Sequence, residues 1–383
     1  MIPYGRQSID AADIDAVVEV LKSDFLTQGP AVPRFEQALA DYCGASHGVA
    51  ACNATAALHL SCLALGLGPG DLLWTSPITF VASANCALYC GAEVDFVDID
   101  PRSCTMSAER LAEKLERAER AGRLPRIVVP VHLAGQSADM RAIAELARRY
   151  GFKIIEDASH AVGASYADAR VGGCRYSDIA VFSFHPVKII TTGEGGMAMT
   201  NDPALADRMA LLRTHGITRD PQRLPSPALG PWYYEQRALG YNYRMTDIQA
   251  ALGYSQLQRL DAIVARRRDL AARYDQAFEG LPLIRPWQQP ESQSSYHLYV
   301  IRVDAADHRA MFQKLRDAGI GVNLHYIPVP RQPYYRDLGF DPADWPEAER
   351  YYAEAMTLPL YPDLGEDEQD SVIAAVKGAL GCA

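Results

Sequence analysis

The sequence predicts an α/β protein with two lobes. The larger lobe is built on a mainly parallel seven-stranded sheet covered by helices, and a smaller α+β lobe follows it. Seven short apolar runs alternate with amphipathic helical patterns between residues 48 and 201. These runs are apolar throughout, as is typical of strands buried on both faces. From Thr246 a long helical pattern leads into a second strand–helix region, so we divide the chain into 1–245 and 246–383.

The seven predicted strands share this continuous apolar character. They are 48–52, 71–76, 93–100, 126–133, 152–158, 178–184 and 195–201. Helical patterns such as "SAERLAEKLERAER" and "ADMRAIAELARRYG" lie between them, and the second ends in glycine, as helices often do. In sheets of this kind ligands bind beyond the carboxyl ends of the strands, so a functional site is expected there.

The C-terminal part predicts a smaller α+β lobe. Its first element is one long connecting helix, "TDIQAALGYSQLQRLDAIVARRRDLAARYDQAF". The strand-like "YHLYVIRV" and "IGVNLHY" and further helical stretches follow. Just before this part, residues 218–240 form the longest stretch without clear periodicity, and loops of that length are usually functional or disordered.

Composition excludes several classes of function. With 37 basic and 47 acidic residues the net charge is −10, so no broad cationic surface is available for nucleic acid or an anionic membrane. Neither a secretory signal nor a membrane-spanning run is visible, which predicts a cytoplasmic protein. The eight cysteines indicate reduced, mostly buried thiols. Cys86 and Cys90 are four residues apart but lack further ligands at zinc-type spacing, so no metal site is predicted.

Polar residues follow three of the predicted strands. The first strand leads into a helix with Thr55 in its first turn, where free backbone amides and the helix dipole suit a phosphate. Asp157 ends another strand, and His160 comes three residues later. Ser183 and Lys188 follow the strand at 178–184. A phosphate site, a carboxylate and a lysine are therefore expected above one crevice.

This set fits pyridoxal 5′-phosphate (PLP) better than other common cofactors. The PLP aldehyde needs a lysine to form an imine, the pyridine nitrogen needs a carboxylate, and the phosphate needs amides and hydroxyls. During transamination the lysine amine can also move a proton. Taken alone, Lys188 is an ordinary loop lysine, Asp157 and Thr55 are helix caps, Phe80 is a core residue and Gly195–Gly196 is a turn. Only the ordered set supports the cofactor.

Other cofactor motifs fit less well. "GLGPGD" follows a helix and precedes a strand, which is the reverse of the order in a dinucleotide-binding loop, and it lacks the third glycine. There is no Walker-type phosphate loop and no nucleophile elbow. Redox and phosphoryl-transfer chemistry are therefore disfavoured.

Several motifs resemble those of the DegT/DnrJ/StrS-type nucleotide-sugar aminotransferases. They are "FLTQGPAVPRFE", "EDASHAVGA", "FSFHPVKIITTGEGGMAMTND" and "GYNYRMTDIQAALGYSQL", and the resemblance covers essentially the whole chain. It implies the PLP-dependent transferase fold of type I and a homodimer with shared active sites. Within the family, "SFHPVKIITTGEGG", "GPWYYEQRALGYNYR" and "GIGVNLHYIPVPRQPYY" resemble the members that act in the pseudaminic acid pathway. This closer resemblance implies transfer of an amino group from L-glutamate to C4 of a UDP-linked 4-keto-6-deoxy-2-acetamido sugar.

The resemblance also implies roles for single residues at the cofactor. Lys188 would hold PLP covalently, Asp157 would pair with the pyridine nitrogen, and His160 would lie near the ring's phenolic oxygen. Phe80 would pack on the ring face. The phosphate would be bound by Ala54, Thr55 and Ser183, and by Asn242 of the neighbouring subunit. The sugar-nucleotide side would be lined by Tyr4, Asp24, Phe25, Leu26, Thr27, His325 and Tyr326.

The chain departs from the family's motif beside the predicted phosphate site. It has Asn53 where the family usually has Gly or Ser, and Ala56 where Ser is common. The missing hydroxyl at residue 56 is expected to weaken one phosphate contact.

Three alternatives remain at this stage. The first is an aminotransferase of the same family acting on another UDP-linked sugar or on a dTDP- or GDP-linked keto sugar. The second is a PLP-dependent sugar dehydratase, but that branch has histidine in place of the lysine present here as Lys188. The third is a non-catalytic regulator of the same fold, which would have no need of Lys188, Asp157 and Thr55 together.

Overall fold

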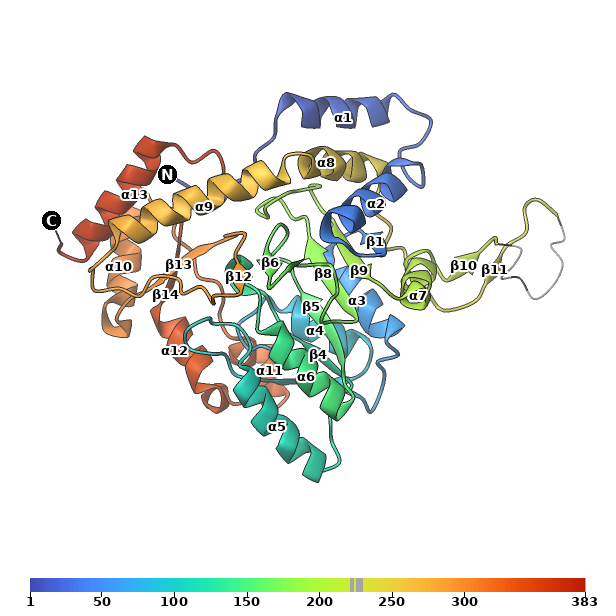
Figure 1. Ribbon diagram of the computed structural model, residues 1–383, viewed down its shortest axis with the longest axis horizontal. Helices are drawn as coiled ribbons and strands as arrows, with labels where there is room; N and C mark the ends of the chain where they lie inside the picture. Colours follow the sequence, from blue (N-terminus) through green and yellow to red (C-terminus); the bar gives the residue numbers. More distant parts are fainter. Residues whose placement is uncertain (221–223, 225–229, 383) are drawn as a thin grey trace.

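A seven-stranded sheet forms the centre of the molecule (Figure 1). The structure is a computed structural model that describes residues 1–220, 224 and 230–382. The strand order is β1-β9-β8-β5-β4-β2-β3. The strands are β1 (His47–Ala51), β2 (Leu72–Thr75), β3 (Glu93–Phe96), β4 (Ile127–Val129), β5 (Lys153–Asp157), β8 (Ile179–Ser183) and β9 (Gly196–Thr200). The predicted sheet is thus confirmed: it is parallel except for β9, which runs antiparallel to both β1 and β8.

Helices cover both faces of this sheet. They are α2 (Ala31–Cys43), α3 (Ala54–Ala64), α4 (Ala82–Tyr89), α5 (Ala108–Arg120), α6 (Met140–Tyr150) and α7 (Pro203–Arg213). The first helix, α1 (Ala11–Leu21), packs instead on α8 (Asp247–Leu257). Capping explains several ends. The side chain of Ser107 accepts the amide of Arg110 at the start of α5, and Gly151 ends α6 with φ of 81°.

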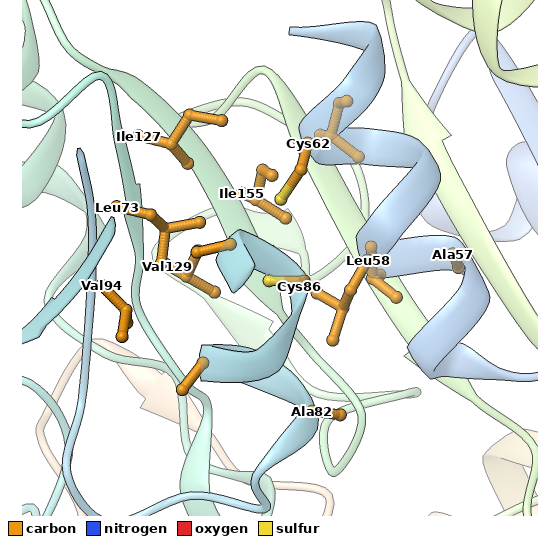
Figure 2. Close-up of a cluster of buried hydrophobic side chains, with 14 of the residues drawn as sticks. Ala57, Leu58, Cys62, Leu73, Ala82, Cys86, Val94, Ile127, Val129 and Ile155 are labelled. Atoms are coloured by element: carbon orange, nitrogen blue, oxygen red, sulfur yellow. The ribbon is translucent and has the colours of Figure 1, made fainter. Parts of the chain in front are cut away.

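The continuous apolar strands reflect burial on two sides, because neighbouring residues of one strand face different cores. Ile127 and Val129 pack against α3 and α4, whereas Val128 lies between them in sequence and packs with α5 and α6. Figure 2 shows the first of these cores, with Cys62 of α3 and Cys86 of α4 facing the sheet. Both cysteines pack there as small apolar side chains.

The predicted long connecting helix is wrong as a single element. It is divided into α8 (Asp247–Leu257) and α9 (Leu260–Ala277) at Gln258–Arg259. Here Arg259 donates hydrogen bonds to Ser8 O and to Asp13 of α1, which ties the break to the N-terminal part of the chain. No glycine or proline marks the break, so helical periodicity runs through it.

The α8–α9 pair passes from one core to another (Figure 1). Ile263 and Val264 of α9 pack with the sheet and α2, whereas Leu270 and Tyr274 pack in the C-terminal core. That core contains β13 (Tyr299–Arg302), β14 (Ala355–Leu358), α10 (Ala305–Asp317) and α13 (Glu366–Ala379). α11 (Pro333–Asp337) and α12 (Pro346–Glu354) complete this part. The predicted domain boundary after residue 245 stays a prediction.

Besides the β13–β14 pair of the C-terminal core, the described part of the chain has two more short sheets outside the centre. One joins β12 (Ser292–Gln293), β6 (Ser165–Tyr166) and β7 (Ala169–Arg170). The other pairs β10 (Ile217–Thr218) with β11 (Glu235–Gln236), at the base of the arm at the right of Figure 1. β10 thus ends at the first residue of the predicted aperiodic segment 218–240, and β11 lies near the end of that segment. Residues 221–223 and 225–229 of the segment lie outside the described residues. No helix in the described part of the chain is long and apolar enough to cross a membrane.

Gly253 lets α8 approach its neighbours closely. A Cβ at this position would lie 2.6 Å from a methyl carbon of Thr192 and 2.7 Å from the ring of Phe35 in α2. Both neighbours are buried. A side chain at residue 253 would therefore push α8 away from α2.

We predict that Gly253→Ala destabilises the protein, although alanine is the better helix former by about 1 kcal/mol. Overpacking a buried contact costs about 1–3 kcal/mol, which exceeds that gain. The matched control is Gly378→Ala in α13, where a Cβ would meet no atom within 4 Å. Thermal unfolding should show a lower Tm for Gly253→Ala and an unchanged or higher Tm for Gly378→Ala. Equal Tm shifts in the two variants would contradict the packing argument.

Candidate active site

Strand register brings the predicted site residues to one edge of the sheet. Ala51 at the end of β1 pairs with Gly196 of β9, and Gly196 in turn pairs with Ser183 at the end of β8. Asp157 at the end of β5 pairs with Val181 of β8. Because β1, β9, β8 and β5 are consecutive in the sheet, the start of α3, the serine and the carboxylate lie in a row along this edge.

The first turn of α3 offers two free backbone amides. The amides of Ala54 and Thr55 make no hydrogen bond within the described part of the chain. The next amide, that of Ala56, donates to the side-chain oxygen of Asn53 at 2.8 Å. The amide of residue 56 is therefore occupied by the helix cap, and an anion at this terminus is left with the amides of residues 54 and 55.

Gly196 lies directly against the backbone that carries these amides. A Cβ at residue 196 would lie 2.5 Å from the amide nitrogen of Ala54. Atoms this close cannot coexist, so any side chain would displace the first turn of α3. The glycine is thus required by the close approach of β9 to α3, and it does more than turn the chain.

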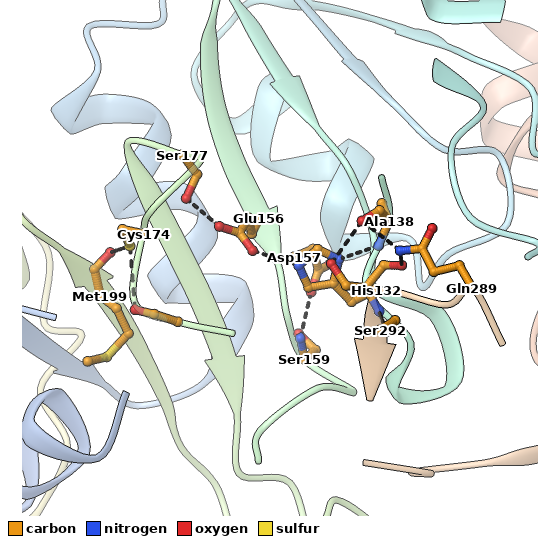
Figure 3. Close-up of polar contacts among 12 residues, drawn as sticks. His132, Ala138, Glu156, Asp157, Ser159, Cys174, Ser177, Met199, Gln289 and Ser292 are labelled. Carbon is orange, nitrogen blue, oxygen red and sulfur yellow. Dashed lines mark hydrogen bonds and ion pairs between the residues drawn. The ribbon is translucent and has the colours of Figure 1, made fainter. Parts of the chain in front are cut away.

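Asp157 is buried, with 5% of its surface exposed, and both of its carboxylate oxygens accept hydrogen bonds. Ser83 of α4 donates to Oδ2 at 2.5 Å. The amide of Ser159 donates to Oδ1 at 3.1 Å (Figure 3). The preceding residue, Glu156, faces the other side of the sheet, where it binds His132 at 2.7 Å. Only Asp157 of these two carboxylates therefore faces the site.

Lys188 lies in the loop after β8, where its amide donates to the carbonyl of His185. Burial lowers the pKa of its amine to about 8, and the nearby charge of Asp157 partly opposes that shift. About half of the amine is then neutral at pH 8, against less than about 1% for an ordinary lysine. A neutral amine is the form that attacks an aldehyde.

His160 is held in one tautomer beside this lysine. Burial and the charge of Lys188 lower the pKa of His160 well below its usual range, so the ring is neutral. The amide of Ala134 donates to its Nδ1 at 3.2 Å, which places the ring proton on Nε2. Nε2 in turn lies 3.0 Å from the hydroxyl oxygen of Tyr326.

Aromatic rings surround this group. The Tyr326 ring lies 6.3 Å from that of Phe80, and the Tyr4 ring lies 5.2 Å from that of His325. Phe80 is 58% exposed, so one side of its ring is free for a ligand. The structure thus brings Tyr4, Phe80, His325 and Tyr326 to the site from distant parts of the sequence.

The segment from Asp24 to Thr27 and Asn242 are not joined to this group. Within the described residues no hydrogen bond or ring contact links either of them to Lys188 or its neighbours. The segment is an exposed loop between α1 and α2, held by Asp247, whose carboxylate accepts the amides of Gly29 and Ala31. Asn242 is exposed, and the rings on either side of it stack on each other 4.8 Å apart.

Three residues of the site were missed in the sequence. Ser83 binds Asp157, His297 lies with its ring 4.4 Å from that of His160, and Asp247 anchors the loop that contains residues 24–27. Each contact joins residues that are far apart in the chain. No local pattern indicates such contacts, although Asp247 could have been noticed as part of the motif "MTDIQAALG".

These residues fit PLP. Two free amides at a helix N-terminus suit its phosphate, a buried carboxylate with both oxygens hydrogen-bonded suits its protonated ring, and a lysine of lowered pKa suits its aldehyde. A mainly parallel sheet with this set at its carboxyl edge defines a PLP-dependent transferase.

The comparison with known proteins agrees with this class of protein. The model of the DegT/DnrJ/EryC1/StrS aminotransferase family matches residues 7–377. The spore coat polysaccharide biosynthesis protein SpsC of Bacillus subtilis is 40% identical over 98% of this chain and 96% of its own length. The chain therefore belongs to the DegT/DnrJ/EryC1/StrS aminotransferase family, and it is a PLP-dependent sugar aminotransferase.

Solved structures share the whole fold. PseC of Helicobacter pylori, an aminotransferase involved in the biosynthesis of pseudoaminic acid, is 29% identical with a TM-score of 0.91 and covers 99% of both chains. The putative sugar aminotransferase Spr1654 of Streptococcus pneumoniae, in its PLP form, is 31% identical with a TM-score of 0.90, over 99% of this chain and 98% of its own. The predicted fold class and cofactor are thus confirmed.

We predict that Lys188 of the cofactor-free protein becomes reactive near pH 8. The rate of its reductive methylation, followed by peptide mass spectrometry, should rise about tenfold per pH unit below pH 8 and level off above it. In Asp157→Asn the midpoint should fall further, because the Asp157 charge is what raises the pKa of Lys188. A midpoint near pH 10 would contradict the burial of this amine.

We also predict that Gly196→Ala raises the dissociation constant for PLP at least about tenfold, the cost of one hydrogen bond to a charged group. The new Cβ displaces the amide of Ala54. Gly68→Ala is the control, since a Cβ there meets nothing within 4 Å. Fluorescence titration of the cofactor-free protein measures both constants. Equal constants in the two variants would mean that the first turn of α3 does not bind the phosphate.

Proposed function

We propose that this enzyme moves an amino group from L-glutamate to C4 of a UDP-linked 4-keto-6-deoxy-2-acetamido sugar. The observation that carries the catalytic part is the lysine of lowered pKa beside the buried carboxylate of Asp157, at the sheet edge that also bears the free amides of α3. The substrate part is supported by the similarity to PseC over the whole chain.

In this proposal each residue acts on a defined atom. PLP, when bound, supplies an aldehyde carbon that accepts an amino group from the donor and releases it to the keto sugar. Lys188 would hold the cofactor through its amine, and the free amine would carry protons between the reacting carbon atoms of substrate and cofactor. Asp157 accepts a hydrogen bond from the ring nitrogen. The amides of Ala54 and Thr55, with the Ser183 hydroxyl, bind the phosphate.

His160 and Phe80 complete the cofactor side. The proton on Nε2 of His160, which the amide of Ala134 holds in place, can be donated to the ring's phenolic oxygen. Phe80 covers one ring face, with Tyr326 beside it. The sugar nucleotide would lie on the side of Tyr4 and His325. Burial lowers the pKa of both His160 and His325, so these two rings add no positive charge beside Lys188.

We propose a homodimer with shared sites. In a single chain the segment at residues 24–27 and Asn242 lie apart from Lys188, although the family resemblance gives both a role in binding. This is the arrangement expected if each completes the site of the partner subunit, with Asn242 reaching the partner's phosphate. The cytoplasmic location stays a prediction.

A second candidate is amino transfer to another nucleotide-linked keto sugar. The specific observation in its favour is that SpsC, a protein of spore coat polysaccharide biosynthesis, is 40% identical to this chain, whereas PseC is 29% identical. The chemistry at Lys188 would be the same, and only the sugar-nucleotide side would differ.

The test is a panel of UDP-, dTDP- and GDP-linked keto sugars incubated with L-glutamate and the PLP-loaded enzyme. We expect amino-sugar product, identified by mass and NMR, with kcat/KM at least about tenfold higher for the UDP-linked 4-keto sugar, as one specific polar contact would provide. Lys188→Ala should lose multiple turnover by at least about 10³-fold, while Lys314→Ala on α10 serves as the matched control.

The outcomes separate the two parts of the proposal. A preference for a dTDP- or GDP-linked sugar would overturn the substrate and leave the aminotransferase chemistry. Sustained turnover by Lys188→Ala would overturn the assigned role of the lysine.

A further inference from the structure

Two buried hydroxyls stand behind Asp157. Ser83, in the first turn of α4, has no exposed surface, and Thr79 is 2% exposed. Their oxygens lie 2.7 Å apart, and the Ser83 oxygen lies 2.5 Å from Oδ2 of Asp157. The three side chains thus form a continuous chain of hydrogen bonds from the loop between β2 and α4 to the end of β5.

The direction of this chain follows from counting protons. A serine hydroxyl has one proton, and a carboxylate can only accept, so Ser83 must donate to Asp157. The alternative acceptor of Ser83, the carbonyl of Phe80, is farther away at 3.3 Å. With its proton used, Ser83 can only accept from Thr79, which therefore donates. Each hydroxyl orients the next, and the last orients the carboxylate.

The arrangement leaves the carboxylate little freedom. Oδ2 is held by Ser83 and Oδ1 by the amide of Ser159, so neither oxygen can turn away without leaving a buried donor unpaired. The turn that carries Thr79 and Ser83 also carries Phe80, the residue assigned to the ring face.

We propose that Ser83, oriented by Thr79, is a positioning residue that keeps the Asp157 carboxylate aimed at the ring nitrogen of the cofactor. This inference rests on the proposed role of Asp157. It adds a hydroxyl pair that touches neither substrate nor cofactor and acts only through Asp157. Thr79, Phe80 and Ser83 lie in the same turn. One short segment would therefore position both the carboxylate at the ring nitrogen and the side chain on the ring face.

The proposal predicts a graded effect on the bound cofactor. Ser83→Ala removes the donor to Oδ2 and should raise the dissociation constant for PLP about tenfold, the size expected for one hydrogen bond to an ion. Thr79→Val removes only the orienting bond and should raise it less, about threefold. Ser83→Thr keeps the hydroxyl and should lie closer to the wild type than Ser83→Ala.

The second readout is the pH titration of the bound cofactor's absorbance. A less firmly held carboxylate stabilises the ring proton less, which leaves less positive charge on the ring to lower the pKa of its imine. The midpoint should therefore move to higher pH in Ser83→Ala, with a smaller move in Thr79→Val. Ser61→Ala is the matched control: Ser61 is also a fully buried helical serine, but it donates to the carbonyl of Ala57 and is not in contact with Asp157.

Thermal unfolding of the cofactor-free variants separates this role from a purely structural one. A lower Tm with an unchanged dissociation constant and midpoint in Ser83→Ala would overturn the proposal. Asp157→Asn distinguishes it from the proposed function. If Asp157→Asn changes both readouts and Ser83→Ala changes neither, the positioning role is wrong; if Asp157→Asn changes neither, the role of Asp157 itself is wrong.

Discussion

The buried carboxylate of Asp157 is the charge on which the site depends. Burial lowers the pKa of Lys188, and the charge of Asp157 limits that shift, so that the amine titrates near pH 8 rather than far below it. A buried charge is stable only when its polar atoms are satisfied, and here Ser83 and Ser159 bind one carboxylate oxygen each. The helices and loops around the site supply these donors.

The sheet makes this possible through its order and one reversed strand. The neighbours β1, β9, β8 and β5 bring the start of α3, Ser183 and Asp157 to the same edge. Because β9 runs antiparallel to the strands on both sides, it begins where they end, and Gly196 lies against the first turn of α3. The glycine-rich turn is thus a packing requirement of the anion site. Neutral histidines around Lys188 leave the lysine as the main positive charge there.

Much of the fold could be predicted because its signals are local. Apolar runs predicted all seven strands of the sheet, and most of them are buried on both faces as expected. The edge strand β3 differs, since Glu93 is exposed and Asp95 is partly exposed. The break between α8 and α9 was missed because it leaves the helical period intact. The contact observed there, from Arg259 to Asp13, joins distant segments and has no local signal in the sequence. The ladder between β10 and β11 was missed because two-residue strands carry no detectable alternation.

The sequence alone determined the class of chemistry, since a helix N-terminus, a carboxylate and a lysine each follow a predicted strand, and the ends of parallel strands must meet. It could not determine which atoms hold those groups in place. The contacts of Ser83, His297 and Asp247 described above each join residues more than seventy positions apart in the chain. Only packing brings these side chains to Asp157, His160 and the loop before α2. The tautomer of His160 was likewise decided by the backbone of Ala134. The sequence specifies the type of each side chain, whereas the direction of each hydrogen bond depends on the neighbours that the fold places beside it.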